Sequence, residues 1–198
     1  MKMKSSRLLA LTTALVAGFA VTCYAPPQPN PIVSRVLSPY ITVANAVQQG
    51  AITGLDVLPN KSGNGIKLAS LQHGVTLPID PASGLPTGQR KHSVLTVVKQ
   101  LDSTTPKFYR ALVNNENLTQ VVIRFYGTTA DSTVTNFFTY TLSNARVTAI
   151  RNWQPNANDP AAAPYVQPEE ISFSYQSITW RDELNAVETQ DSWNSQAQ

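Results

Sequence analysis

The stretch TTPKFYRALV (residues 104–113) is the one short segment of this 198-residue chain whose pattern predicts an α-helix. Thr105 can cap the helix N-terminus, and Pro106 at the first helical position loses no hydrogen bond. Phe108 and Leu112 lie four residues apart on one face, and the two asparagines that follow suit a helix end. Two turns of helix are not stable alone in water, so the segment predicts a helix packed against a sheet.

The rest of the chain is rich in the β-branched and aromatic residues that favour strands. In TQVVIRFYG (119–127), Val121, Ile123 and Phe125 share one face of the predicted strand. Strands are expected in the segments 40–47, 90–100, 119–127, 134–142, 145–153 and 171–184, and segment 66–79 predicts either a strand pair or one long bent strand. The apolar phase changes near residues 176–177, which indicates either a bulge or a strand whose two halves bury different faces. The sequence predicts a mainly β fold, a small closed β-barrel of mostly antiparallel strands with one short α-helix.

The N-terminus carries a different signal. A basic start is followed by an apolar run over residues 8–21, which predicts a secretory signal peptide over residues 1–25. The run is too short for a standard membrane-spanning helix. Cleavage fits after residues 23–25 or after residues 18–20, although Pro26 disfavours the first. Lipidation of the cysteine at position 23 and a buried core helix stay open as alternatives.

Turn-forming residues divide the remainder of the chain. Residues 26–39 contain five prolines and predict an extended linker, residues 40–193 a single folded domain, and residues 194–198 a flexible tail. Loops dense in Pro, Gly, Asn and Asp are expected at 59–65, 80–89 and 154–170. The segment 154–170 is long and rich in proline, and such loops in a compact domain are usually functional or form interfaces.

Charge and cysteine content exclude several function classes. The chain has 15 basic and 12 acidic residues, but three of the basic ones, Lys2, Lys4 and Arg7, lie in the predicted signal. The remaining chain is therefore near neutral, which argues against nucleic-acid binding and against membrane binding beyond the signal segment. Cys23 is the only cysteine, so the domain is expected to have neither a disulfide nor a thiolate metal site.

The sequence contains no pattern that predicts catalysis. His73 and His92 are not in a metal-ligand spacing, and His92 is expected in a strand with one face at the surface. Glu169 and Glu170 are adjacent, so in a strand they point to opposite faces, and a solvated strand entry is expected. Asp102, just before the helix, predicts capping. We therefore predict no catalytic, cofactor-binding or metal-binding residues, no cofactor, and a protein that is not an enzyme.

Several segments together carry a resemblance to a known family. They are PIDPASGLPTGQRKHSVLTVVKQLDSTTPKFYRALVNNENLTQVVIRFY, NFFTYTLSNARVTAIR, NDPAAAPYVQPEEISFSYQSITW and DSW. In this order they resemble the Hcp family, the tube-forming proteins of bacterial type VI secretion. The resemblance implies a tight β-barrel that assembles into hexameric rings stacked as a hollow tube. It also implies sheath and spike proteins as partners and small effectors carried in the lumen.

The predicted signal peptide departs from this family, whose members assemble in the cytoplasm and leave through the apparatus. Two functions therefore stay open. One is a structural tube subunit that is secreted by the apparatus. The other is an exported Hcp-like binding module or effector that passes through the periplasm and acts there or outside the cell. A secreted hydrolase is disfavoured, because the sequence lacks a catalytic constellation.

Overall fold

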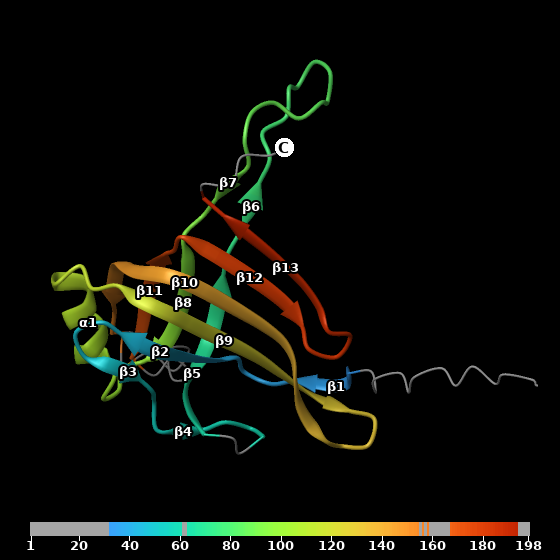
Figure 1. Ribbon diagram of the computed structural model, residues 1–198. Coiled ribbons are helices and arrows are strands. Elements are labelled where there is room, and N and C mark those ends of the chain that lie inside the picture. Colours follow the sequence, from blue (N-terminus) through green and yellow to red (C-terminus); the bar gives the residue numbers. More distant parts are fainter. Residues whose placement is uncertain (1–31, 61–62, 155, 157, 159–166, 194–198) are drawn as a thin grey trace, which may run out of the picture.

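The fold is an antiparallel β structure that carries one helix in the described ranges, as seen in a computed structural model (Figure 1). The structure describes residues 32–60, 63–154, 156, 158 and 167–193. The strands are β1 (Ile32–Val36), β2 (Tyr40–Ala46), β3 (Gly50–Ile52), β4 (Asp56–Val57), β5 (Asn64–Gln72), β6 (Val75–Thr76), β7 (Lys91–His92), β8 (Leu95–Gln100), β9 (Leu118–Thr129), β10 (Val134–Asn152), β11 (Pro168–Ser174), β12 (Ser177–Asp182) and β13 (Val187–Ser192). The helix α1 spans Thr105–Val113. The predicted signal (1–25) and tail (194–198) lie outside the described residues.

Six of these strands form a closed ring of pairings. The order is β9–β2–β5–β8–β11–β10, and β10 pairs again with β9, so the last strand meets the first. All six pairings are antiparallel. β1 pairs with the far end of β9, and β12 and β13 extend the sheet beyond β10. The predicted mainly β fold with antiparallel strands and one helix is confirmed.

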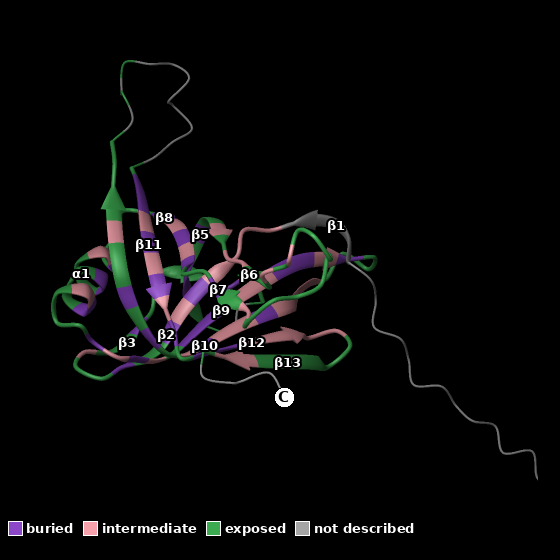
Figure 2. Cartoon of the chain, turned by 90° about the horizontal axis from the view of Figure 1, so that it is seen from above, coloured by how far each residue is buried: buried purple, intermediate pink, exposed green. Residues whose placement is uncertain are grey.

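Alternating apolar side chains fill the barrel. Ile41 and Val43 on β2, and Leu95 and Val97 on β8, are almost completely buried, as the two-residue period of a strand requires. Figure 2 shows the buried residues along the barrel strands and the more exposed ones on β13. In the described part of the chain, no helix is long and apolar enough to cross a membrane.

The helix α1 packs on this core with a small shift from the prediction. Thr105, predicted as the N-cap, is the first helical residue, and Thr104 takes the N-cap position without a side-chain capping bond. The carboxylate of Asp102 instead accepts a hydrogen bond from the backbone N–H of Thr104 at 2.7 Å, which confirms its capping role. Phe108 is fully buried, and its ring meets Phe173 of β11 edge-on at 6.1 Å. The helix therefore supports the barrel wall.

Strand β10 corrects one prediction. Segments 134–142 and 145–153, predicted as two strands, form one continuous strand. Its first half pairs with β9 and β12, and its second half pairs with β11. Asn144, between the two halves, has a left-handed backbone with φ 49°. Asparagine tolerates this conformation, so the strand can bend there without ending.

The predicted single strand over 171–184 is also corrected, because it is divided into β11 and β12. β11 pairs with the second half of β10 and β12 with its first half, so the phase change marks a corner of the barrel. At this corner the backbone N–H of Gln176 donates to the carbonyl oxygen of Ser143 at 3.0 Å.

β13 was not predicted, because its sequence VETQDS lies at the sheet edge and has no apolar alternation.

Two further segments differ from the sequence prediction. Part of the predicted linker 26–39 is strand β1, which pairs with β9 from Ile32 opposite Thr129 to Val36 opposite Gly127. Segment 66–79, predicted as a strand pair or one long bent strand, contains two strands, β5 and β6. The predicted strand over 90–100 is interrupted between β7 and β8, and between β5 and β8 the chain makes a long excursion. We call residues 73–93 the arm. It contains β6 and β7 and projects from the barrel (Figure 1).

Candidate assembly surfaces and a histidine cluster

The arm is an ordered hairpin. β6 pairs with β7 near its base, and Ile79 forms an isolated bridge with Pro86 nearer its tip. The backbone N–H of Asp80 donates to the carbonyl oxygen of Leu85 at 2.9 Å. Its carboxylate accepts a bond of 2.7 Å from the hydroxyl of Ser83. These bonds close the tip into a defined turn within the predicted loop 80–89.

The tip of the arm exposes large apolar side chains. Leu77 is 49% exposed, Ile79 63% and Leu85 65%. Single exposed apolar residues are common, but a group on one projecting hairpin is typical of a surface that contacts another molecule. We call these three residues the arm tip.

A second apolar surface lies on β9 and β10. Phe125, Phe137, Phe138 and Tyr140 line an open hollow of about 260 Å³, which we call the aromatic hollow. Phe125 lies at its centre, with its ring 5.1 Å from that of Tyr140 and 6.3 Å from that of Phe138. Because the walls are aromatic rings, the hollow fits apolar side chains.

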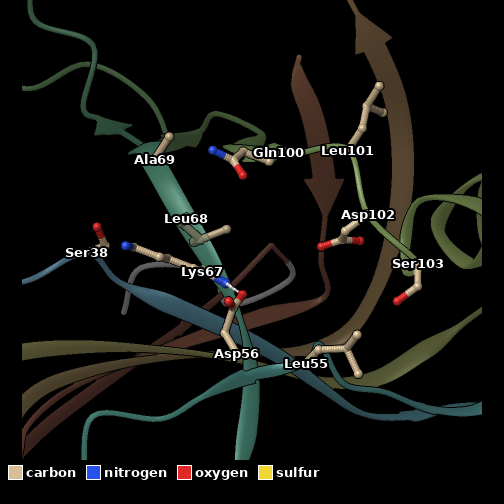
Figure 3. Close-up of a pocket in the computed structure, with 10 residues that line it drawn as sticks. All are labelled: Ser38, Leu55, Asp56, Lys67, Leu68, Ala69, Gln100, Leu101, Asp102 and Ser103. Carbon is tan, nitrogen blue, oxygen red and sulfur yellow. Dashed lines mark hydrogen bonds between the residues drawn. The ribbon is translucent and has the colours of Figure 1, made fainter. Parts of the chain in front are cut away.

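A cleft of about 540 Å³ with a mixed polar and apolar lining lies elsewhere on the barrel. Figure 3 shows the residues that line it, which are Ser38, Leu55, Asp56, Lys67, Leu68, Ala69, Gln100, Leu101, Asp102 and Ser103. The carboxylate of Asp56 accepts the backbone N–H of Lys67 at 3.0 Å, and Asp102 is engaged at the start of α1. The cleft has no histidine among its lining residues, and both of its carboxylates accept hydrogen bonds from the backbone.

The two adjacent glutamates have different environments. Their side chains point to opposite faces, as predicted, but Glu169 is fully buried and not solvated, which corrects the prediction. Its Oε2 lies 2.9 Å from Nζ of Lys99, which is also buried, and accepts the Thr105 hydroxyl at 2.7 Å. Glu170 lies at the surface, 3.1 Å from a guanidinium nitrogen of Arg151. The buried pair links β8 and β11 to the start of α1.

The two histidines lie close together, although their separation along the chain does not suggest it. His73 Nε2 is 2.6 Å from the hydroxyl of Tyr175, and His92 Nδ1 is 3.0 Å from the same hydroxyl. His92 Nε2 is 2.9 Å from Asp191, which also forms two hydrogen bonds with Arg90. The side chain of His92 is 2% exposed, so the expected surface face is not observed. We call these five residues the histidine cluster.

The environment of the cluster shifts the pKa values of three members, and the hydrogen bond to Asp191 raises that of Arg90. Burial and the neighbouring His92 lower the pKa of His73 below its usual 6.5. Burial and the charge of Asp191 raise the pKa of Tyr175 to about 12. In the part of the chain that the structure describes, no three His, Cys, Asp or Glu side chains are grouped so that they could hold a metal ion. The cluster is therefore a hydrogen-bonded network at the base of the arm.

Sequence reasoning missed the cluster because its members lie on four separate segments of the chain. Only the antiparallel return of the arm and the pairing of β12 with β13 bring them together. The sequence signal that could have pointed to the cluster was the aromatic residues around position 175 and in the closing DSW. In the structure, the ring centroid of Trp193 from this DSW lies 5.6 Å from that of His92.

Comparison with known proteins gives consistent results. The family model described as "Type VI secretion system effector, Hcp" matches residues 40–181. A Pseudomonas aeruginosa protein named major exported protein is 35% identical over 130 residues, which cover 66% of this chain and 76% of that protein.

Solved structures are similar over most of the barrel. A crystal structure of an Hcp protein has a TM-score of 0.72 at 27% identity and covers 80% of this chain and 99% of its own. A tryptophan-substituted Hcp1 from E. coli EAEC 042 has a TM-score of 0.68 at 20% identity, over 79% and 99% of the two chains. The secreted Hcp3 of Pseudomonas aeruginosa has a TM-score of 0.63 at 22% identity, over 81% and 100%. The last two share the fold, while the family model and the exported relative establish that the chain belongs to the Hcp family of type VI secretion system proteins.

Proposed function

We propose that this chain is a structural tube subunit of a type VI protein secretion system, which forms hexameric rings that stack head to tail. The observation that supports this proposal most directly is the pair of unlike apolar surfaces on the barrel, the arm tip and the aromatic hollow. Their role is to bind other copies of the chain, and the protein acts through assembly rather than catalysis.

Unlike surfaces suit this kind of assembly. Ile79 and Leu85 are exposed in the single chain, so they do not fill the aromatic hollow of their own barrel. A contact between two different patches on successive copies is heterologous, and its repetition generates closed rings or open stacks. The predicted loops 59–65 and 154–170 are further candidates for contacts between copies.

The partners and the destination follow from the family assignment as part of the same proposal. The exported relative from Pseudomonas aeruginosa supports secretion of this chain. A contractile sheath around the tube, a spike protein at its tip and small effectors in its lumen are the expected partners.

Substitutions at the arm tip test the assembly role. The double variant Ile79→Asp/Leu85→Asp places two charges on the tip, and Val187→Asp is a matched control, because Val187 on β13 is also 62% exposed. Electron microscopy and sedimentation of the purified proteins should show rings and stacks for wild type and the control. The double variant should lose the stacks. Equal assembly of the double variant, or a wild type that stays monomeric at high concentration, would contradict the proposal.

One observation favours a second function, an exported binding module or effector. The basic and apolar pattern of residues 1–25 is typical of a secretory signal, which a tube subunit does not need. Cell fractionation with N-terminal sequencing, in a strain that lacks the sheath, separates the two functions. Processed protein outside the cytoplasm of that strain supports the exported module, and unprocessed protein retained inside supports the tube subunit.

A further inference from the structure

The only two histidines of the chain lie at the two ends of the arm. His73 directly follows β5, where the arm leaves the barrel, and His92 lies in β7, where the arm returns. Both contact the hydroxyl of Tyr175, at 2.6 Å and 3.0 Å. Tyr175 is 5% exposed and lies at the barrel corner between β11 and β12. One buried hydroxyl therefore ties both ends of the arm to the barrel.

The partners of these groups determine where the hydrogens lie. A carboxylate only accepts, so His92 Nε2, 2.9 Å from Asp191, carries a hydrogen. In a neutral ring, Nδ1 then accepts, and the hydroxyl of Tyr175 donates to it. The oxygen of Tyr175 accepts in turn from Nε2–H of His73. With tautomers assigned from these partners, the bonds run in one direction from His73 to Asp191.

The surroundings limit the charge that the cluster can hold. The charged groups that face it are Asp191 on β13 and Arg90 in the arm, and they bind each other through two hydrogen bonds. The other faces are covered by the aromatic rings of Tyr140, Tyr175, Trp180 and Trp193. Tyr140 also titrates, and burial raises its pKa, so it is neutral wherever histidine titrates. Asp191 can offset one imidazolium, but much of its charge is already balanced by Arg90.

One proton fits this network. If His92 gains it, Nδ1–H donates to the oxygen of Tyr175, and the hydroxyl of Tyr175 then donates to Nε2 of His73. His73 needs only to shift its own hydrogen to Nδ1. The two hydrogen bonds to Tyr175 survive in the reversed direction, the bonds that His92 and Arg90 donate to Asp191 stay as they are, and the new charge lies beside Asp191.

A second proton does not fit. With both imidazoles protonated, two N–H groups point at one hydroxyl oxygen, and the hydrogen of Tyr175 has lost both acceptors. The two positive rings then have centroids only 6.3 Å apart. His73 is the less buried ring, so it is the one that can leave towards water.

We infer that the histidine cluster is a proton-controlled clamp, which holds both ends of the arm to the barrel until a second proton releases the His73 end. If the arm joins successive rings, acid will also weaken their stacking. That consequence rests on the proposed function, whereas the clamp is a property of the single chain.

Hydrogen exchange of the purified full-length chain tests the clamp at about pH 7.5 and about pH 5. After correction for intrinsic rates, arm amides of the wild type should exchange roughly tenfold faster at the lower pH, the effect of losing about one hydrogen bond. His73→Gln keeps an amide donor that cannot gain a proton, so its arm should not respond to acid. Lys91→Gln removes a nearby charge at an exposed position of β7 and should respond like wild type.

A second measurement needs no variant. Because the chain has two histidines, the NMR titration of wild type contains two imidazoles, which should titrate as a coupled pair with His73 as the ring that resists the second proton. Independent titrations, an arm unchanged between the two pH values, or an acid response in the His73→Gln variant would each overturn the clamp. An arm that loosens in acid while rings stack equally well at both pH values would support the clamp and refute the proposed role of the arm in stacking.

Discussion

The buried pair of Lys99 and Glu169 allows a quantitative stability prediction. Their side chains are 1% and 0% exposed, and Nζ of Lys99 lies 2.9 Å from Glu169, 3.0 Å from Asp102 and 2.6 Å from the carbonyl oxygen of Gln100. Glu169 Oε1 has no hydrogen-bond partner among the described residues. Lys99→Met would therefore leave a buried carboxylate with the Thr105 hydroxyl as its remaining donor, at 2.7 Å. Removing one member of such a pair costs about 3–5 kcal/mol.

A double-mutant cycle tests the reasoning. Glu169→Gln should cost about 1–3 kcal/mol, because Lys99 keeps Asp102 as a partner. The double variant should lose about 2 kcal/mol less free energy of unfolding than the two single variants together. Urea unfolding at pH 7, followed by far-UV circular dichroism, gives the free energies, and Lys67→Met on the exposed face of β5 is a control expected within about 0.5 kcal/mol. A Lys99→Met cost no larger than that of the control, or strict additivity, would refute the argument.

Three further predictions follow from single positions. Gly54→Ala should lower the free energy of unfolding by about 1–3 kcal/mol, because a Cβ there would overlap the backbone of Gly65, whereas Gly74→Ala, with its nearest neighbour at 3.6 Å, should stay within about 1 kcal/mol. Asp102→Ala should lower the free energy of unfolding by about 1–2 kcal/mol and speed amide exchange in the first turn of α1. The pKa of Tyr175, raised to about 12 from 10.0, means that the folded state holds this proton more tightly than the unfolded state. Urea unfolding should therefore show a stability contribution that is present below pH 10 and lost as the pH rises to about 12. Because the pKa values of Tyr40, Tyr126 and Tyr140 are also raised, Tyr175→Phe should reduce this loss and leave a smaller one.

Local signals account for the parts of the fold that the sequence predicted. The Thr-Pro start of α1 and the asparagines after it limit a helix without reference to the rest of the chain. The alternation in β9 places Val121 and Ile123 on one face, and both are fully buried. The only sign in the sequence that 171–184 divides into two strands is the change of apolar phase. The corner itself could not be predicted, because it depends on which half of β10 each strand pairs with.

The buried charges show where local reasoning stops. Glu169 is in phase with Ile171 and Phe173, and Lys99 is in phase with the apolar residues of β8, so the alternation marks both as inward. An inward charge needs a partner, and the sequence does not say which one. The register of β8 and β11 supplies it by placing Lys99 directly opposite Glu169. The histidine cluster depends in the same way on strand pairings between distant segments.

The edge of the sheet bears on how copies of this chain can join. Closing the barrel removes free edges from six strands, but β13 ends the sheet order beyond β12. An exposed edge strand invites pairing with another chain unless charges oppose it. β13 carries Glu188, which is paired with Arg181, and Asp191, which is held in the histidine cluster. Strand addition at this edge would bring these acidic groups against the backbone of a neighbour. Contacts through side-chain surfaces such as the arm tip and the aromatic hollow avoid that cost, and they are therefore the better candidates for joining one subunit to the next.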